Sequence, residues 1–337
     1  MRPKATLLPI LLVTLFASAG CSLMTSKDAG GLANKTVVVT GASSGFGRGI
    51  ALALAQRNAR VVVAARNESA LQQLAREAGD ADIQVVTADV GKPEDVARLA
   101  RTAIEHFGHI DVWINNAGVG ALGRFEDIPV EDQLRVVNVN LDGVILGSHQ
   151  ALTHFKERGR GTLINVGSVE GRVPLPYQAT YVATKHAVVG FGAALNQELR
   201  LAKQRDIHVV TVNPFATDTP FFLHSANYTG RAPRSVLLDP PDKVIEAVLG
   251  AIERPRPEIA VGWKAKASQA SQRVSRTLTE AAVAAVYHRE QMKEAPPAER
   301  TSGTLHDPGG EGGSVDGGNK ERIALEDSAR TLKNRKE

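Results

Sequence analysis

The chain of 337 residues has one cysteine, few aromatic residues and no long block of like charge. The single cysteine, Cys21, excludes an intramolecular disulfide and a cysteine-based metal site, and we expect no metal. Aromatic residues make up 4% of the chain, and its net charge of +4 is spread along the sequence. A nucleic-acid surface requires a dense basic patch, so we expect no nucleic-acid partner. Aliphatic residues are plentiful, and a hydrophobic fraction of 43% predicts an ordinary globular core.

The first 24 residues have the pattern of a targeting segment. Two basic residues precede an apolar run from Ala5 to Phe16, and small residues then lead to Cys21. This order is typical of a secretory signal, and small residues directly before a cysteine resemble a bacterial lipobox, which would leave Cys21 lipidated. The alternatives are an uncleaved anchor that ends near residue 24 and a mistaken start site. The signal and the anchor both predict membrane association through residues 1–24.

Short β-branched runs alternate with helical patterns between residues 35 and 262. Strands are predicted at 36–40, 60–65, 83–88, 112–115, 161–166, 207–212 and 258–261, and helices at 45–56, 68–77, 93–107, 130–156 and 179–201. This alternation predicts a single α/β domain with a doubly wound, seven-stranded parallel sheet. A helical extension is expected over 263–294. The Pro-Pro pair, the glycine-rich run and the charged end predict a mostly disordered tail over 295–337.

A glycine-rich turn follows the first predicted strand and opens the first helix. Glycines allow the backbone to approach a pyrophosphate, and a helix N-terminus offers free N–H groups with a partial positive charge. The spacing is G-x-x-x-G-x-G, which differs from the G-x-G-x-x-G of the long-chain dehydrogenases. The residues predicted to bind the cofactor here are Gly41, Ser43, Ser44, Gly45, Phe46 and Gly47.

The end of the second strand predicts which dinucleotide binds. An NAD site of this type carries an acidic residue there, which binds the adenine ribose hydroxyls. This chain has Ala64-Ala65-Arg66 instead. No carboxylate would repel a 2′-phosphate, and the Arg66 guanidinium can bind one as a planar fork. The sequence therefore favours NADP(H), with a solvated surface arginine as the alternative.

Further motifs follow in a fixed order, and together with the glycine turn they resemble the short-chain dehydrogenase/reductase family over about residues 35–262. These motifs are Asp89-Val90, Asn115-Asn116-Ala117-Gly118, Asn140, Ser168 and Tyr181-Val182-Ala183-Thr184-Lys185. The resemblance implies a Rossmann-type fold and an NADP-preferring carbonyl reductase or alcohol dehydrogenase. It adds Asp89, Val90, Asn116, Ala117, Gly118, Tyr181, Lys185, Thr217 and Thr219 to the expected cofactor site. We also expect a homodimer or homotetramer.

The expected chemistry follows from the residue types at the catalytic positions. Tyr181 and Lys185 lie one helical turn apart on the same face. A free tyrosine has a pKa of about 10, and we expect the neighbouring ammonium and the positively charged nicotinamide to lower it. Tyr181 would then donate a proton to the developing alkoxide, while Ser168 holds the same oxygen. The family assigns Lys185 a second contact with the nicotinamide ribose and Asn140 the anchoring of a proton-relaying water, although Asn140 could also be a structural amide.

The loop after the sixth strand departs from the family pattern and predicts the substrate class. The family usually has Pro-Gly there, whereas this chain has Pro214-Phe215, with Thr217 and Thr219 still in their expected positions. The following Phe221-Phe222-Leu223-His224 is a candidate apolar lid. We therefore expect a small apolar carbonyl or alcohol as substrate, with His224 at the rim of the pocket.

Two other functions compete with that of an enzyme. One is a non-catalytic NADP-binding sensor or scaffold at the membrane, and the other is a structural lipoprotein. The complete catalytic set argues against both. The compartment stays open, although a supply of NADPH would favour the cytoplasmic face.

Overall fold

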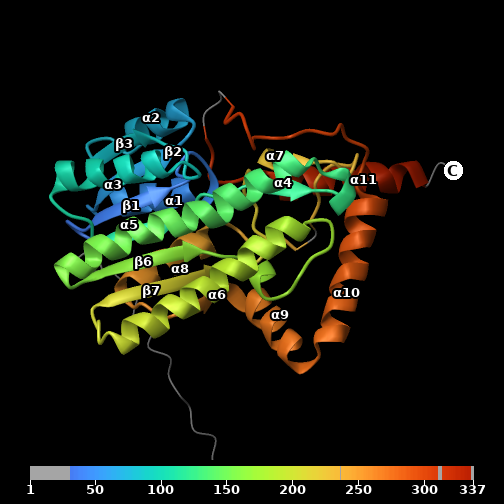
Figure 1. Cartoon of the computed structure of the whole chain (residues 1–337). Helices are drawn as coiled ribbons and strands as arrows, with labels where there is room; N and C mark the ends of the chain where they lie inside the picture. The colour runs from blue at the N-terminus through green and yellow to red at the C-terminus, as the bar shows by residue number, and fades with distance from the viewer. Residues whose placement is uncertain (1–30, 236, 310–312, 335–337) are drawn as a thin grey trace, which may run out of the picture.

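A computed structural model describes residues 31–235, 237–309 and 313–334. Seven parallel strands form one sheet in the order β3-β2-β1-β4-β6-β7-β9 (Figure 1). They are β1 (Thr36–Thr40), β2 (Arg60–Ala65), β3 (Ile83–Thr87), β4 (Val112–Asn115), β6 (Gly161–Val166), β7 (Ile207–Asn213) and β9 (Glu258–Ala260). The predicted seven-stranded sheet is confirmed, and each strand ends within one residue of its predicted bounds.

Both faces of the sheet are buried, which explains why its strands are continuous apolar runs. On β1, Val37 and Val39 belong to one hydrophobic core and Val38 to the other. Helices α1 (Gly45–Ala55), α2 (Glu68–Glu77) and α8 (Asp242–Glu253) contribute side chains to the first core. Helices α3 (Pro93–Phe107), α5 (Gly143–Arg158) and α6 (Ala179–Leu201) contribute to the second. The strand order reverses between β1 and β4, and ligands of such sheets bind at this switch point.

The structure corrects the single helix predicted over 130–156. It consists of α4 (Val130–Val137), a π-helical segment η2 (Asn138–Asp142) and α5. The residues of η2 carry no helix-breaking signal, so periodicity alone extends the helix through them. A π-helical turn inside an α-helix is rare and is frequent at functional sites, and this one contains Asn140.

Several short elements complete the domain. They are β5 (Ala121–Leu122), which pairs with β8 (Ala226–Asn227), the 3₁₀ turns η1 (Phe125–Asp127) and η3 (Val169–Gly171), and the short helix α7 (Phe221–His224). Among these, η3 directly follows Ser168, and α7 contains the candidate lid. They surround the carboxyl ends of the strands.

Beyond β9 the chain forms a helical arm and then returns to the sheet. Helices α9 (Gly262–Val274) and α10 (Arg276–His288) form a V that projects from the domain (Figure 1). A π-helical segment, η4 (Arg289–Glu294), follows, and the chain ends in α11 (Asn319–Asn334).

The described part of the tail differs from the disordered tail expected over 295–337. Leu305 and Ile323 are buried. The buried Arg234 forms ion pairs with Glu290 before the tail and with Glu326 and Asp327 in α11. A few such anchors order a segment whose composition predicts disorder.

No helix in the described ranges is long and apolar enough to cross a membrane. The targeting segment predicted over residues 1–24, including Cys21, lies outside the described residues.

Candidate active site

The glycine turn lies between β1 and α1 and packs tightly against the loop after β4. Gly41 has a φ of +67°, and a Cβ there would lie 2.6 Å from the Ala117 Cα. A Cβ on Gly47 would lie 2.2 Å from the Gly41 carbonyl oxygen. The Asn116 side chain donates to the carbonyls of Thr40 and Gly41, at 2.9 and 3.2 Å. Glycine is therefore required at both positions, and the two loops are held together at the switch point of the sheet.

A cavity of about 830 Å³ runs from this turn across the carboxyl ends of the strands. Its wall includes every residue predicted for the cofactor or for catalysis except Gly47 and Asn140. The sixteen predicted residues that line it are Gly41, Ser43, Ser44, Gly45, Phe46, Arg66, Asp89, Val90, Asn116, Ala117, Gly118, Ser168, Tyr181, Lys185, Thr217 and Thr219. The ordered motifs of the sequence thus lie around one cavity.

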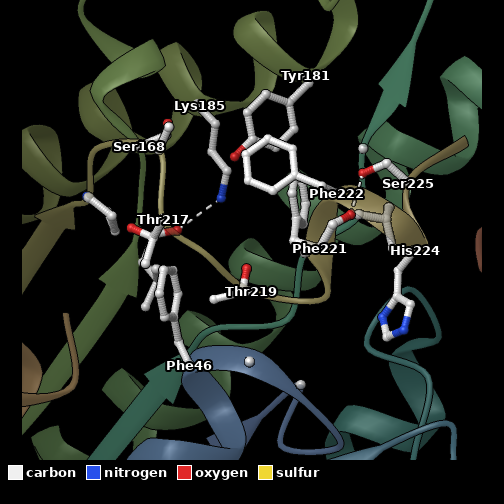
Figure 2. A pocket seen from close by; sticks show the side chains of 18 of the residues that line it. Phe46, Ser168, Tyr181, Lys185, Thr217, Thr219, Phe221, Phe222, His224 and Ser225 are labelled. Carbon is white, nitrogen blue, oxygen red and sulfur yellow. Dashed lines mark hydrogen bonds between the residues drawn. The ribbon is translucent and has the colours of Figure 1, made fainter. Parts of the chain in front are cut away.

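The catalytic candidates come together at one end of this cavity (Figure 2). Tyr181 and Lys185 lie in the first turns of α6, and Ser168 follows β6. The Ser168 hydroxyl lies close enough to the Tyr181 phenol to lower its pKa. The Lys185 Nζ lies 5.5 Å from the centroid of the Tyr181 ring and donates to the Val166 carbonyl at 2.9 Å. Two hydroxyls and an ammonium are therefore available to one reacting oxygen.

The side chains of this chain raise the pKa of Tyr181, whereas we expected the ammonium and a bound nicotinamide together to lower it. Burial raises the pKa of the phenol, the nearby Glu170 carboxylate raises it further, and the nearby Ser168 hydroxyl lowers it only in part. Burial also lowers the pKa of Lys185 to about 8, against the opposing effect of Glu170. Sequence reasoning missed the burial of the phenol and the nearby Glu170, which both raise the pKa of Tyr181. The phenol of the cofactor-free chain is held in its protonated form.

Asn140 is fully buried in η2 behind the cavity wall. Its Oδ1 accepts from the Val119 N–H at 2.8 Å, and its Nδ2 donates to the Val119 carbonyl at 2.9 Å. The amide therefore fixes the loop after β4 to the π-helical segment. The water-anchoring role implied by the resemblance remains a prediction.

Arg66 lies on the cavity wall after β2, and its guanidinium already has partners. One terminal nitrogen donates to the Leu305 carbonyl at 2.7 Å, and the other donates to the Thr304 carbonyl. Burial and the nearby Arg135 lower the pKa of Arg66. Burial tends to raise the pKa of the adjacent Asp89, but hydrogen bonds from Arg135 and from the Gly91 N–H lower it overall. Sequence reasoning missed Arg135, which lies far from the glycine turn in the sequence.

Apolar side chains line the cavity next to the catalytic candidates. Phe221 packs on Tyr181 with ring centroids 5.6 Å apart, and Phe222 also lines the cavity (Figure 2). His224 lies on the wall as well, and burial lowers its pKa. Helix α10 adds a further apolar wall made of Ala282, Val283, Val286 and Tyr287. The sequence indicated the two phenylalanines, whereas the contribution of α10 depends on the fold of the arm.

The loop after β7, which contains Phe215, is held in place by contacts of Thr217. The Thr217 hydroxyl donates to the Phe215 carbonyl at 2.7 Å, and Thr217 bridges to Asp239. The Lys264 ammonium lies 5.6 Å from the Phe215 ring centroid. Phe215 therefore becomes part of the cavity wall, and Thr217 and Thr219 line the cavity.

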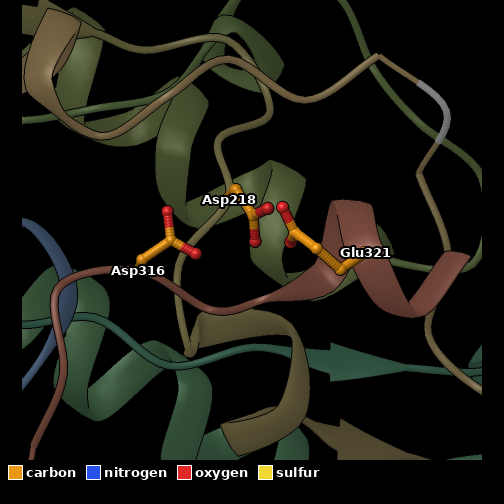
Figure 3. Close-up of side chains that lie close together, drawn as sticks. All are labelled: Asp218, Asp316 and Glu321. Carbon is orange, nitrogen blue, oxygen red and sulfur yellow. The ribbon is translucent and has the colours of Figure 1, made fainter. Parts of the chain in front are cut away.

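Three carboxylates, Asp218, Asp316 and Glu321, lie close together beside this loop (Figure 3). Asp218 accepts hydrogen bonds from the N–H groups of Asn319 and Lys320, at 2.8 and 3.0 Å. These donors lower the pKa of Asp218 against the effect of burial. Asp218 thus caps the N-terminus of α11, which accounts for its position.

An open parallel sheet with a glycine turn at its switch point and a Tyr–Lys–Ser cluster beside it defines a nicotinamide-dependent dehydrogenase or reductase. The chain belongs to the short-chain dehydrogenase family, whose model matches residues 35–227. The resemblance seen in the sequence is thereby confirmed.

Individual relatives agree with this assignment. The chain is 38% identical to the uncharacterized oxidoreductase YxnA of Bacillus subtilis, over 82% of this chain and 79% of that protein. A 3-ketoacyl-(acyl-carrier-protein) reductase from Brucella melitensis, solved with NADH, matches with a TM-score of 0.60 and 33% identity, over 68% of this chain and 96% of that one. An alcohol dehydrogenase from Thermococcus sibiricus, solved with 5-hydroxy-NADP, matches with a TM-score of 0.57 and 29% identity, over 66% of this chain and 91% of that one.

Proposed function

We propose that this protein interconverts a ketone or aldehyde and the corresponding alcohol with NADP(H), on a substrate with an apolar body. The convergence of the Tyr181 phenol, the Ser168 hydroxyl and the Lys185 ammonium at one end of the cavity carries this proposal. The apolar wall formed by Phe221, Phe222 and α10 supports the substrate class.

Each residue of the cluster has a separate role in the reduction of a carbonyl. A nicotinamide bound in this cavity would supply the hydride, with its electron pair, that the carbonyl carbon accepts. Tyr181 donates its phenolic proton to the carbonyl oxygen, and Ser168 donates a hydrogen bond that holds this oxygen in place. The Lys185 charge stabilises the phenolate that remains until solvent returns a proton. In the oxidation direction the same groups act in reverse, and Tyr181 accepts the alcohol proton.

Replacement of the proton donor tests the catalytic assignment. Tyr181→Phe keeps the ring and its packing on Phe221 but removes the hydroxyl, so turnover of NADPH with a panel of ketones should fall at least ~100-fold. NADPH binding, measured by nicotinamide fluorescence, should persist. Tyr177→Phe is the matched control, because the Tyr177 hydroxyl bonds to His288 and this residue is not part of the catalytic set. Unchanged turnover in Tyr181→Phe would show that another group is the acid.

The proposed preference for NADP(H) rests on the end of β2, where Arg66 faces the cavity and residues 64–66 include no carboxylate. A bidentate contact between a guanidinium and a phosphate is worth about 1.5–3 kcal/mol. Arg66→Asp should therefore weaken NADPH binding by at least ~10-fold and reverse the preference towards NADH. Equal dissociation constants of NADPH and NADH in the parent protein would contradict the proposal.

We also propose that residues 1–24 attach the protein to a membrane, because a basic start precedes an apolar run there. Deletion of this segment should move the protein from the membrane fraction to the soluble fraction. If Cys21 carries a lipid, Cys21→Ser should abolish labelling by a fatty-acid probe. If the segment is an uncleaved anchor, Cys21→Ser should leave the fractionation unchanged. Full-length protein that is wholly soluble would contradict both versions.

A further inference from the structure

The C-terminal segment crosses the outer side of the cofactor groove, and its described residues 301–309 and 313–318 are called the strap below. Thr301 exchanges backbone hydrogen bonds with Asn227, at 2.7 and 3.0 Å. The Leu305 side chain is fully buried in the hydrophobic cluster that contains Tyr181. At the other end, Asp218 caps α11 directly after the strap. The strap is thus fixed to the domain at both ends and at its centre.

Carbonyl oxygens of the strap bond to donors of the cofactor groove. The Gly45 N–H, at the first turn of α1, donates to the Ser314 carbonyl at 2.7 Å. The two terminal nitrogens of Arg66 donate to the carbonyls of Leu305 and Thr304. Helix N-termini and guanidinium groups are the usual protein partners of phosphate. The strap therefore occupies donors that suit a dinucleotide.

Two guanidinium groups converge on one of these oxygens. The Leu305 carbonyl accepts from Arg66 at 2.7 Å and also from the Arg135 Nε at 3.1 Å. Arg135 also pairs with the Asp89 carboxylate and bonds to Asn138, whereas the Arg66 guanidinium bonds to the neutral carbonyls of Thr304 and Leu305. A phosphate would replace these carbonyls with charge-assisted hydrogen bonds. The position of this oxygen thus has the donor set of a phosphate subsite.

We propose that the strap covers the 2′-phosphate subsite assigned above to Arg66, beside which Arg135 also lies, and that it thereby sets the selectivity between NADP(H) and NAD(H). Either dinucleotide has to displace the Ser314 carbonyl from the Gly45 N–H, but only a 2′-phosphate also has to displace residues 304–306 from Arg66. The free energy needed to displace the strap then offsets part of the favourable binding free energy of the phosphate, so NADP(H) binds more weakly. This inference rests on the proposed function in one respect, namely that the groove binds a nicotinamide dinucleotide.

Gly303 offers a way to loosen the strap beside Thr304. Its φ is +55°, and a Cβ there would lie 2.3 Å from the His224 carbonyl oxygen, so Gly303→Ala pushes the strap outwards. Gly159→Ala is the matched control, because Gly159 has a φ of +74° but a Cβ there meets nothing within 4 Å. The control carries the same type of backbone strain at the end of α5, away from the cavity.

The experiment measures the dissociation constants of NADPH and NADH for the full-length parent and both variants by nicotinamide fluorescence. Freeing Arg66 from competing carbonyls should strengthen NADPH binding about tenfold in Gly303→Ala, with NADH binding changed by less than about twofold. Gly159→Ala should change neither. Weaker NADPH binding in Gly303→Ala, or an equal change for both cofactors, would overturn the inference.

Two further measurements separate the strap from a general effect on the fold. In an Arg66→Ala background, Gly303→Ala should no longer strengthen NADPH binding, because the guarded donor is gone. An unchanged tenfold gain in that background would contradict the inference. Arg135→Gln should weaken NADPH binding and spare NADH binding, and equal weakening of both would exclude Arg135 from the subsite.

Hydrogen exchange on the parent protein tests the same idea without a substitution. NADP⁺ should speed exchange of the Thr301 and Thr304 N–H groups, which now donate to the carbonyls of Asn227 and His224, whereas NAD⁺ should not. Slower exchange with NADP⁺ would mean that the strap closes on the cofactor, which is the opposite of this inference. If neither dinucleotide binds to the parent, the proposed function itself fails.

Discussion

Glu170 makes the stability of this protein depend on pH in a way that one substitution should remove. The residue follows Ser168 by two positions and lines the cavity, and its Oε2 is shut off from solvent without a hydrogen-bond partner among the described residues. Burial raises its pKa from 4.5 to about 7, although the Lys185 charge opposes the shift. The folded protein therefore binds a proton at pH values where the unfolded chain has released it.

The sign and size of the effect follow from this difference. A folded-state pKa above the unfolded value stabilises the protein below pH 4.5, and the contribution is lost as the pH rises through about 7. Each pH unit across that interval is worth about 1.4 kcal/mol, so the full loss is about 3 kcal/mol. Glu170→Gln keeps the shape and does not titrate. The free energy of unfolding of the parent should fall by about 3 kcal/mol more than that of the variant between pH 4.5 and pH 8.

Urea unfolding followed by tryptophan fluorescence at several pH values between 4.5 and 8 measures this difference. The other titrating groups are the same in parent and variant, so their contributions to the free energy of unfolding cancel in the comparison. Glu105→Gln, an exposed position on α3, is the control and should follow the parent at every pH. Parallel curves for the parent and Glu170→Gln would refute the reasoning, because they would show that this carboxyl has the same proton affinity in the folded and unfolded chains.

Other substitutions test the site and the core. Lys185→Ala should lower both turnover and NADPH affinity, because one side chain is proposed to serve both, and paired kinetic and binding assays would detect a loss of only one. Ser168→Ala should lower turnover and spare NADPH binding in the same assays. Gly147→Ala should destabilise the fold by about 1–3 kcal/mol in urea unfolding, because a Cβ there would lie 2.2 Å from the Asn115 Oδ1. Gly190→Ala, where a Cβ meets nothing within 4 Å, should not destabilise it.

The sequence predicts the sheet well because its strands are buried on both faces. A run such as Val37-Val38-Val39 sends side chains into both cores, so it is apolar throughout and easy to identify. Helix α8 escaped prediction, although its apolar positions, Val244, Ile245 and Val248, have helical spacing after a Pro-Pro pair. The break at η2 could not be predicted, because a π-helical turn requires no special residue types.

The residues of the candidate site also fall into two groups, those that the sequence could predict and those that it could not. Tyr181, Lys185 and Ser168 could be predicted because their chemistry requires particular side chains at particular spacings. Arg135 and Glu170 could not, because their relation to the cavity arises from packing between elements that are distant or irregular. The bonds between Arg66 and the strap were equally hidden, since the acceptors are backbone carbonyls and no side-chain type identifies them.

The bonds between Arg66 and the strap affect which form of the protein should be produced for assay. A recombinant form trimmed after β9, at the end of the parallel sheet, would retain the glycine turn and the Tyr–Lys–Ser cluster but would lack the strap. Its Arg66 would meet solvent instead of the Leu305 carbonyl, and the Leu305 side chain would be missing from the cluster around Tyr181. Cofactor preferences measured on such a truncated form would describe a different binding site from the one that the whole chain builds.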